Sequence, residues 1–304
     1  MSKTSVLAGW SLFLLLLFVS ISSFITGLGT QYAVGALPYL IHGISELLTY
    51  SAATMVVLKL RPAHIKINLR NRPVDGLYTA FLLTASLAAA ILVFLVYYFT
   101  ILPFGGSVNG VFDQYPIGGT PNGRQFLLAV ITLAVIPAIT NELFLRGTIF
   151  SLYESKGTVT AWLLSSAATA MFVPSVKLIL PVLMAGLVCG YVSYVTGSFR
   201  SAAIVRFATR LYGLTIAFAA SHISPGLHWK YFIAGNIAVF FLLAFVVFRC
   251  LQNLTREGLV PHFEEGSEKL TENLKSGVKN AGFLLFTLLF FIRLATIFLA
   301  ATLR

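Results

Sequence analysis

The sequence predicts an all-α fold, a polytopic transmembrane helix bundle of about 8–9 spans. Of its 304 residues, 58% are hydrophobic and only 10% are charged, whereas soluble domains carry about 25% charged residues. The apolar residues gather in runs near the roughly 20 residues that a helix needs to cross a bilayer. Lys and Arg concentrate in the short connections between these runs, as is typical of membrane topology. This distribution accounts for the net charge of +11, so we expect no nucleic-acid partner.

Helices are the expected form of every span, because backbone polar groups left open in lipid are too costly. A β-barrel needs alternating apolar and polar residues, and runs such as Leu14–Leu17 do not alternate. The candidate spans are residues 6–26, 34–58, 77–103, 125–149, 160–176, 178–196, 201–220, 230–250 and 281–301. The fifth to seventh are short and closely spaced.

The basic residues predict a cytoplasmic N-terminus, because Lys and Arg favour cytoplasmic connections. Lys3 precedes the first span, and two basic clusters follow the second and the eighth spans, within residues 59–72 and 249–279. With nine spans these three segments share the cytoplasmic side, and the loop 104–124 faces outward. The connection 252–279 mixes Glu and Lys. We expect an amphipathic surface helix over its last part, 267–279, although a solvated linker fits equally well.

The fourth span ends in a polar motif, Asn141–Gly147. Glu142 and Arg146 are four residues apart and therefore share one helix face. Ionisable residues within a membrane segment are rare and mark functional sites. The alternative is a structural ion pair at a helix end. The predicted topology places both near the cytoplasmic end of the span, where the long side chain of Arg146 can reach the interface.

A second polar pair, His42 and Glu46, occupies one face of the second span. Such a pair suits a proton relay or two ligands of a metal site. A hydrogen-bonded pair packed inside the bundle is the simpler interpretation. An imidazole close to Glu142 would favour a catalytic role. We predict no metal site and no cofactor.

Three features after residue 125 resemble the CPBP family of intramembrane endopeptidases, which includes the CAAX prenyl proteases. Asn141–Gly147 is similar to the family's first motif, Glu-Glu-x-x-x-Arg-Gly. A Gly-rich helix and a Thr-Gly-Ser turn follow, with Gly186, Gly190, Tyr191, Tyr194 and Thr196–Ser198. Residues 202–210 then lie where the family has a His-x-x-x-Asn motif. The resemblance covers residues 125–213.

The resemblance implies a core over residues 125–220, with N-terminal helices and the outward loop in 1–124 and C-terminal helices in 221–304. It implies that Glu142 acts as a base that activates water for peptide hydrolysis. Histidine and asparagine on neighbouring helices would orient the water and stabilise the oxyanion. The family's usual occurrence implies a multi-pass protein of a prokaryotic cell membrane.

The sequence departs from the family's pattern at each further catalytic position. The first motif glutamate is Asn141, and the expected Phe-x-x-x-His after Phe172 has no histidine. Arg206 and Arg210 occupy the His and Asn positions of the third motif, and arginine cannot act as a base. These departures predict a degenerate intramembrane protease that acts as a membrane partner or regulator. Its partners would be membrane lipids and either another membrane protein or a peptide substrate.

Other interpretations stay open. The chain can be an active endopeptidase that uses Glu142, or a transporter, although no repeated pair of interrupted helices supports the latter. Glu142, Arg146, Arg206 and Arg210 can form a buried ion network. Alternatively, their excess positive charge can bind an anion, such as a lipid headgroup, a phosphate or a carboxylate. If Arg206 and Arg210 close on Glu142, we expect no protease activity.

Overall fold

A computed structural model describes residues 3–31, 37–61, 67, 69–101, 123–173, 175–222, 228–261 and 267–302. Every regular element in these ranges is helical, which confirms the all-α fold. The elements are α1 (Lys3–Gln31), α2 (Leu37–Leu60), the 3₁₀ turn η1 (Gly76–Tyr78), α3 (Thr79–Ile101), α4 (Gly123–Ala129), η4 (Val130–Val135), α5 (Ile136–Glu142), η5 (Leu143–Ile149), α6 (Phe150–Glu154), α7 (Thr158–Met171), α8 (Val176–Thr196), α9 (Phe199–His222), α10 (His228–Arg256), α11 (Ser267–Val278) and α12 (Ala281–Thr302).

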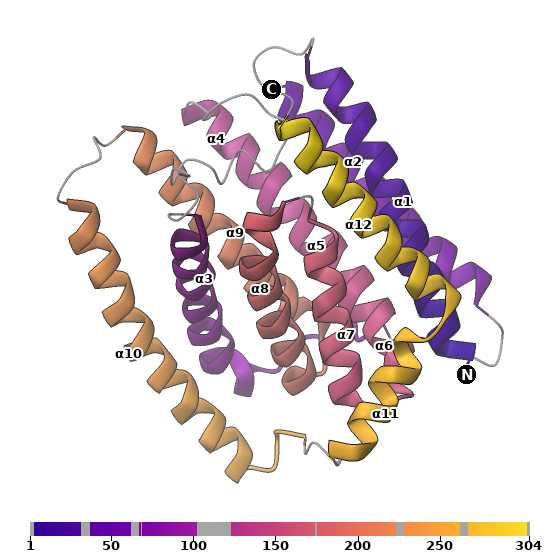
Figure 1. The fold of residues 1–304 in the computed structure, drawn as a ribbon. Helices are drawn as coiled ribbons and strands as arrows, with labels where there is room; N and C mark the ends of the chain where they lie inside the picture. The colour runs from indigo at the N-terminus through magenta and orange to yellow at the C-terminus, as the bar shows by residue number, and fades with distance from the viewer. Residues whose placement is uncertain are drawn as a thin grey trace.

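Eight helical stretches among the described residues are long and apolar enough to cross a membrane. One of them, Gly123–Glu154, runs continuously from α4 to α6. The expected fifth span, 160–176, is instead the 14-residue α7. At ~1.5 Å per residue α7 reaches about 21 Å, which is shorter than the ~30 Å hydrocarbon core. It packs side by side with α8 (Figure 1), so only eight of the nine expected helices qualify as full spans.

The two chain ends lie at opposite ends of the bundle (Figure 1). At the N-terminal end, the hydroxyls of Thr4 and Ser155 are 2.7 Å apart, which places the start of α1 beside the end of α6. The Tyr78 hydroxyl donates to the carbonyl of Leu259 at the same end. The described parts of the predicted basic segments therefore gather at one end of the bundle. The loop predicted to face outward, 104–124, lies outside the described residues except for its last two positions.

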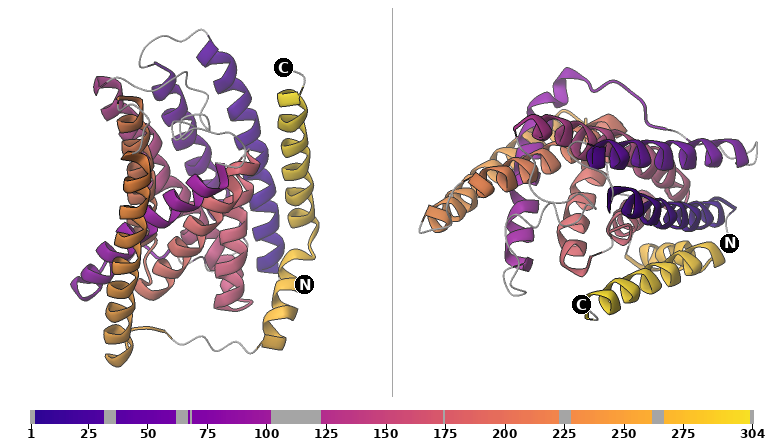
Figure 2. Two further views of the ribbon diagram at one scale, coloured as in Figure 1. Left: turned by 60° about the vertical axis from the view of Figure 1, so that its left-hand side comes forward. Right: turned by 90° about the horizontal axis from the view of Figure 1, so that it is seen from above.

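The amphipathic helix expected near the C-terminus is confirmed as α11, which ends at Val278. It packs against α7 and α1 at the N-terminal end of the bundle. By contrast, α10 lies at the periphery and packs mainly against α3 (Figures 1 and 2). Large side chains such as Tyr231, Phe241 and Phe245 project outward from it. Such an apolar exterior suits contact with lipid.

Close packing of α7 on α8 depends on glycine. The Nε1 of Trp162 in α7 donates to the carbonyl of Leu187 at 2.8 Å, so the indole is fixed against α8. A Cβ on Gly190 would lie 2.5 Å from Cδ1 of that indole. Small residues let membrane helices approach closely, and here one glycine makes room for a hydrogen-bonded tryptophan.

The predicted Thr-Gly-Ser turn is confirmed at the end of α8. Gly197 caps the helix with φ 64°, a left-handed conformation that glycine adopts without steric cost. The Ser198 hydroxyl donates to the carbonyl of Arg72 at 2.6 Å, and the N–H of Phe199 donates to the carbonyl of Arg70. The turn thus anchors the connection between α2 and α3 and sets the start of α9.

Replacing Gly190 by alanine should destabilise the protein relative to the same change at Gly235, where an added Cβ meets nothing within 4 Å. Both changes gain the same helix propensity, so their difference isolates the clash with Trp162. Overpacking of this kind costs about 1–3 kcal/mol. Thermal unfolding in detergent should show a lower midpoint for Gly190→Ala than for Gly235→Ala. Equal midpoints would contradict this account of the α7–α8 contact.

Candidate functional site

The long helix that carries Glu142 is interrupted twice by π-helical turns. η4 precedes α5, and η5 begins directly after Glu142. π-Helical turns occur frequently at functional sites because they alter which side chains share a face. Pro137 lies in α5 and has no N–H to donate to the carbonyl of Leu133, as a regular α-helix would require. Arg210 of α9 donates to this carbonyl at 2.8 Å instead.

Glu142 is the centre of a buried ion cluster. Its side chain is completely buried, and both carboxylate oxygens face arginines. The Nε of Arg146 lies 3.2 Å from Oε2. On the other side, Nη2 and Nε of Arg206 lie 2.7 and 2.8 Å from Oε1. The expected ion network is thus present for these three residues, and Arg210 donates to the backbone carbonyl of Leu133.

Arg146 links four helical segments through one guanidinium. It donates from Nη1 to the hydroxyl of Ser165 at 2.7 Å and from Nη2 to the carbonyl of Gly186 at 2.7 Å. Its side chain is fully buried, so the expectation that it reaches the interface is wrong. The helix continues to Glu154, about 18 Å beyond Glu142 at ~1.5 Å per residue. The cluster therefore lies well inside the bundle.

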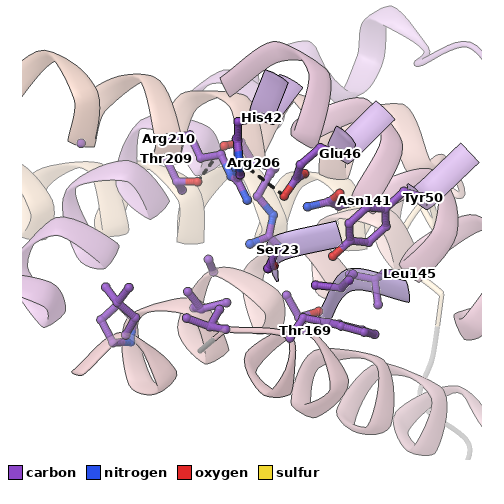
Figure 3. Close-up of a pocket in the computed structure, with 18 of the residues that line it drawn as sticks. Ser23, His42, Glu46, Tyr50, Asn141, Leu145, Thr169, Arg206, Thr209 and Arg210 are labelled. Atoms are coloured by element: carbon purple, nitrogen blue, oxygen red, sulfur yellow. Dashed lines mark hydrogen bonds and ion pairs between the residues drawn. The ribbon is translucent and has the colours of Figure 1, made fainter. Parts of the chain in front are cut away.

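A cavity of about 220 Å³ adjoins the ion cluster. His42, Glu46, Asn141, Arg206 and Arg210 all line it, so the structure brings five of the seven candidate site residues together (Figure 3). The fully buried side chains of Glu142 and Arg146 adjoin this lining through Arg206, which pairs with Glu142.

His42 and Glu46 keep the shared face predicted for them. The His42 Nε2 lies 4.0 Å from the nearer carboxylate oxygen of Glu46, too far for a direct hydrogen bond. Among the described residues, Glu142 forms its ion pairs with Arg146 and Arg206. The second carboxylate oxygen of Glu46 is buried without a hydrogen-bond partner. A ligand or water in the cavity that donates a hydrogen bond to this oxygen would satisfy it.

Two further cavity residues were missed from the sequence. Arg293 of α12 lines the cavity, donates to the carbonyl of Phe172 at 3.0 Å and lies 3.5 Å from the hydroxyl of Ser23. Tyr50 of α2 also lines it and packs edge-on against Phe144 and Phe172. The signal for Arg293 was present as a single cation in the apolar run 281–301. Tyr50 had none, because tyrosine is ordinary in an apolar helix.

This geometry favours binding over base catalysis. Two guanidiniums lie within 3.2 Å of the Glu142 carboxylate and occupy lone pairs that a base would use. Asn141 reaches the cavity, but a neutral amide only positions a water and does not take its proton. Arg206 and Arg210 offer the cavity fixed positive charge.

Comparison with known proteins supports the resemblance found in the motifs. Residues 123–212, from α4 to α9, match the family model described as type II CAAX prenyl endopeptidase Rce1-like. Neither the curated proteins nor the solved structures compared with this chain include a match. The matched segment supplies the whole Glu142–Arg146–Arg206 cluster, together with Asn141 and Arg210. By contrast, His42, Glu46, Tyr50 and Arg293 reach the cavity from outside it.

Removing the negative charge of Glu142 should strongly reduce the stability of the folded protein. Glu142→Gln leaves two arginines buried without their counter-charge, and such a change costs about 3–5 kcal/mol. Glu257→Gln, at an exposed position at the end of α10, should change stability by less than about 0.5 kcal/mol. Thermal unfolding of both variants checks the difference.

A double-mutant cycle tests the contact directly. Arg206→Gln alone should also destabilise, and the combination with Glu142→Gln should cost less than the sum of the two single changes by about 1–3 kcal/mol. Strict additivity would show that the two side chains do not interact as described.

Proposed function

We propose that this chain is a membrane protein on the scaffold of the CAAX prenyl endopeptidases that no longer cleaves peptides through Glu142 and acts as a membrane partner or regulator. The scaffold is supported by the match over residues 123–212 and by the eight candidate spans. The partners we infer are membrane lipids and a second membrane protein.

One observation carries the proposal: the motif glutamate is fully buried and paired with two arginines. A general base must come within hydrogen-bond reach of the water it activates. Glu142 is fully buried and pairs with Arg206, and it is Arg206 that lines the cavity. The residue that took the histidine position has therefore become a structural partner of the former base.

The alternative of an active endopeptidase requires a different base. Glu46 lines the cavity together with Asn141 and His42, so it is the carboxylate best placed to replace Glu142. The 4.0 Å separation of its carboxylate from His42 and the arginines nearby argue against an efficient base. A transporter gains no comparable support, because the intramembrane charges converge on one cavity between helices and not on two repeated halves.

A proteolysis assay tests the proposal. The purified protein in lipid nanodiscs is incubated with a library of membrane-anchored peptides, and cleavage is measured by mass spectrometry for the parent, Glu142→Ala and Glu46→Gln. We expect equal background cleavage from all three. Cleavage by the parent that disappears in either variant would refute the proposal and identify the base. The Glu46 variant keeps the test decisive if Glu142→Ala fails to fold.

We also propose that the N-terminal end of the bundle is cytoplasmic, in the cell membrane of a prokaryote. The support is the concentration of basic residues at that end, including Arg61, Lys156, Arg200 and Lys275. Lys275 is exposed on α11, and Lys230 is exposed near the start of α10, at the opposite end.

Labelling with a membrane-impermeant maleimide tests this orientation in a variant that lacks Cys189 and Cys250. Lys230→Cys should be labelled in intact cells, and Lys275→Cys should be labelled only after the membrane is opened. The reverse pattern would invert the proposed topology.

A further inference from the structure

We propose that the cavity beside the ion cluster binds the ionised form of a long-chain carboxylic acid. Its carboxylate would lie between Arg293 of α12 and Tyr50 of α2, and its hydrocarbon chain would lie against α3 and α8. Both head-group residues come from outside the matched segment 123–212. The inference concerns ligand binding and holds whether or not the chain cleaves peptides.

The charge of Arg293 is the first reason. Arg293 lies twelve residues after Ala281, about 18 Å into a candidate span at ~1.5 Å per residue. Its guanidinium donates to the carbonyl of Phe172 and lies 3.5 Å from the Ser23 hydroxyl. No carboxylate oxygen of the residues that the structure describes comes within 4.0 Å of its nitrogens. The carbonyl at the end of α7 supplies only a partial negative charge. Since an uncompensated cation in a membrane interior is expensive, an anionic ligand would be stabilised here.

The hydroxyl of Tyr50 is the second reason. Tyr50 is only 5% exposed, yet its hydroxyl forms no hydrogen bond with any residue of the described ranges, whereas a buried tyrosine hydroxyl usually has a partner. The Tyr50 ring packs against the ring of Phe172, the residue whose carbonyl accepts from Arg293, so both groups lie beside one residue. Figure 3 shows the Tyr50 hydroxyl pointing into the space that Ser23 also borders.

These two groups determine the chemical class of the ligand. Two of the five N–H groups of Arg293 are directed to Phe172 and Ser23, which leaves three for a ligand. A guanidinium binds a carboxylate through two parallel N–H···O bonds, and the Tyr50 hydroxyl can donate a third. An ionised carboxylate only accepts hydrogen bonds, and its single negative charge matches the single charge of Arg293.

The apolar part of the lining is the third reason. It includes Val93 and Phe94 of α3 and Leu178 and Val182 of α8. A small soluble anion would leave these side chains uncovered, whereas an amphiphile uses both parts, as is usual for ligand sites with few polar groups on apolar walls. Ser23 lines the cavity and is exposed on α1. The cavity therefore reaches the outside of the bundle, and an amphiphile dissolved in the bilayer can enter from the side.

Binding to the purified protein in phosphatidylcholine nanodiscs tests the proposal. The probes are dodecanoate, acetate, methyl dodecanoate and dodecylammonium, added at mildly alkaline pH so that the acid is ionised. The readouts are native mass spectrometry and the thermal unfolding midpoint. We expect dodecanoate to bind and to raise the midpoint of the parent. Arg293→Gln and Tyr50→Phe should each weaken its Kd at least tenfold, about 1.4 kcal/mol, because each removes a hydrogen bond to a charged group. Arg256→Gln, at an exposed position at the end of α10, should leave the Kd unchanged.

A cavity-filling variant tests the site without changing its polar groups. Val182→Trp keeps every charge, fills the apolar part and should also weaken binding of dodecanoate at least tenfold. Val239→Trp, at an exposed position of α10, is the matched control and should leave the Kd unchanged. This pair keeps the test decisive if a variant of Arg293 or Tyr50 fails to fold.

Five results would overturn the proposal. The first is a parent protein that does not bind dodecanoate. Acetate that binds as tightly as dodecanoate would show that the chain contributes nothing, and methyl dodecanoate that binds equally well would exclude a role for charge. Tighter binding of dodecylammonium would assign the site to the unsatisfied oxygen of Glu46. An unchanged Kd in Arg293→Gln, Tyr50→Phe and Val182→Trp would place the ligand elsewhere.

Discussion

The buried carboxylate of Glu142 and the two arginines that hold it are the constraint on which the rest of the structure depends. An ion taken from water into a low-dielectric interior loses several kcal/mol of solvation. This loss is offset only if charged partners and hydrogen bonds replace the water. Here Arg146 and Arg206 supply the charge, and the hydroxyl of Ser165 and the carbonyl of Gly186 satisfy Arg146 in turn. Helices α5, α7, α8 and α9 must therefore meet at one point.

That meeting point also determines what the cavity can do. Arg206 bonds to Glu142 and also lines the cavity, as Asn141 does, whereas the carboxylate of Glu142 is fully buried. The polar part of the cavity wall therefore combines the guanidiniums of Arg206 and Arg210 with the side chains of His42, Glu46 and Asn141.

Single proline and glycine residues determine how the helices pack around the ion cluster. Pro137 removes one backbone donor and Arg210 bonds to the carbonyl that this donor would have used, so an irregularity in one helix becomes a contact with another. Gly190 admits the Trp162 indole, and Gly197 turns the chain into α9. Arg206 and Arg210 of α9 thereby contact the long helix at Glu142 of α5 and at Leu133 of η4.

The sequence alone determined the helical class, most of the spans and the motif that carries the cluster, because composition, hydrophobic run length and i,i+4 spacing are local properties. It determined the turn at Gly197 for the same reason. It also placed a ninth helix at 160–176, where only the short α7 forms, because periodicity does not measure how far a helix reaches before the chain turns back along its neighbour.

Only the tertiary structure decided which of the ions meet. Arg206 and Arg210 are four residues apart in one helix, yet one bonds a carboxylate and the other a carbonyl. His42, Tyr50 and Arg293 join the same cavity from α2 and α12, over 90 residues away in the chain from Asn141. Their convergence depends on how distant helices pack, and a desolvated ion takes whichever partner that packing brings within reach.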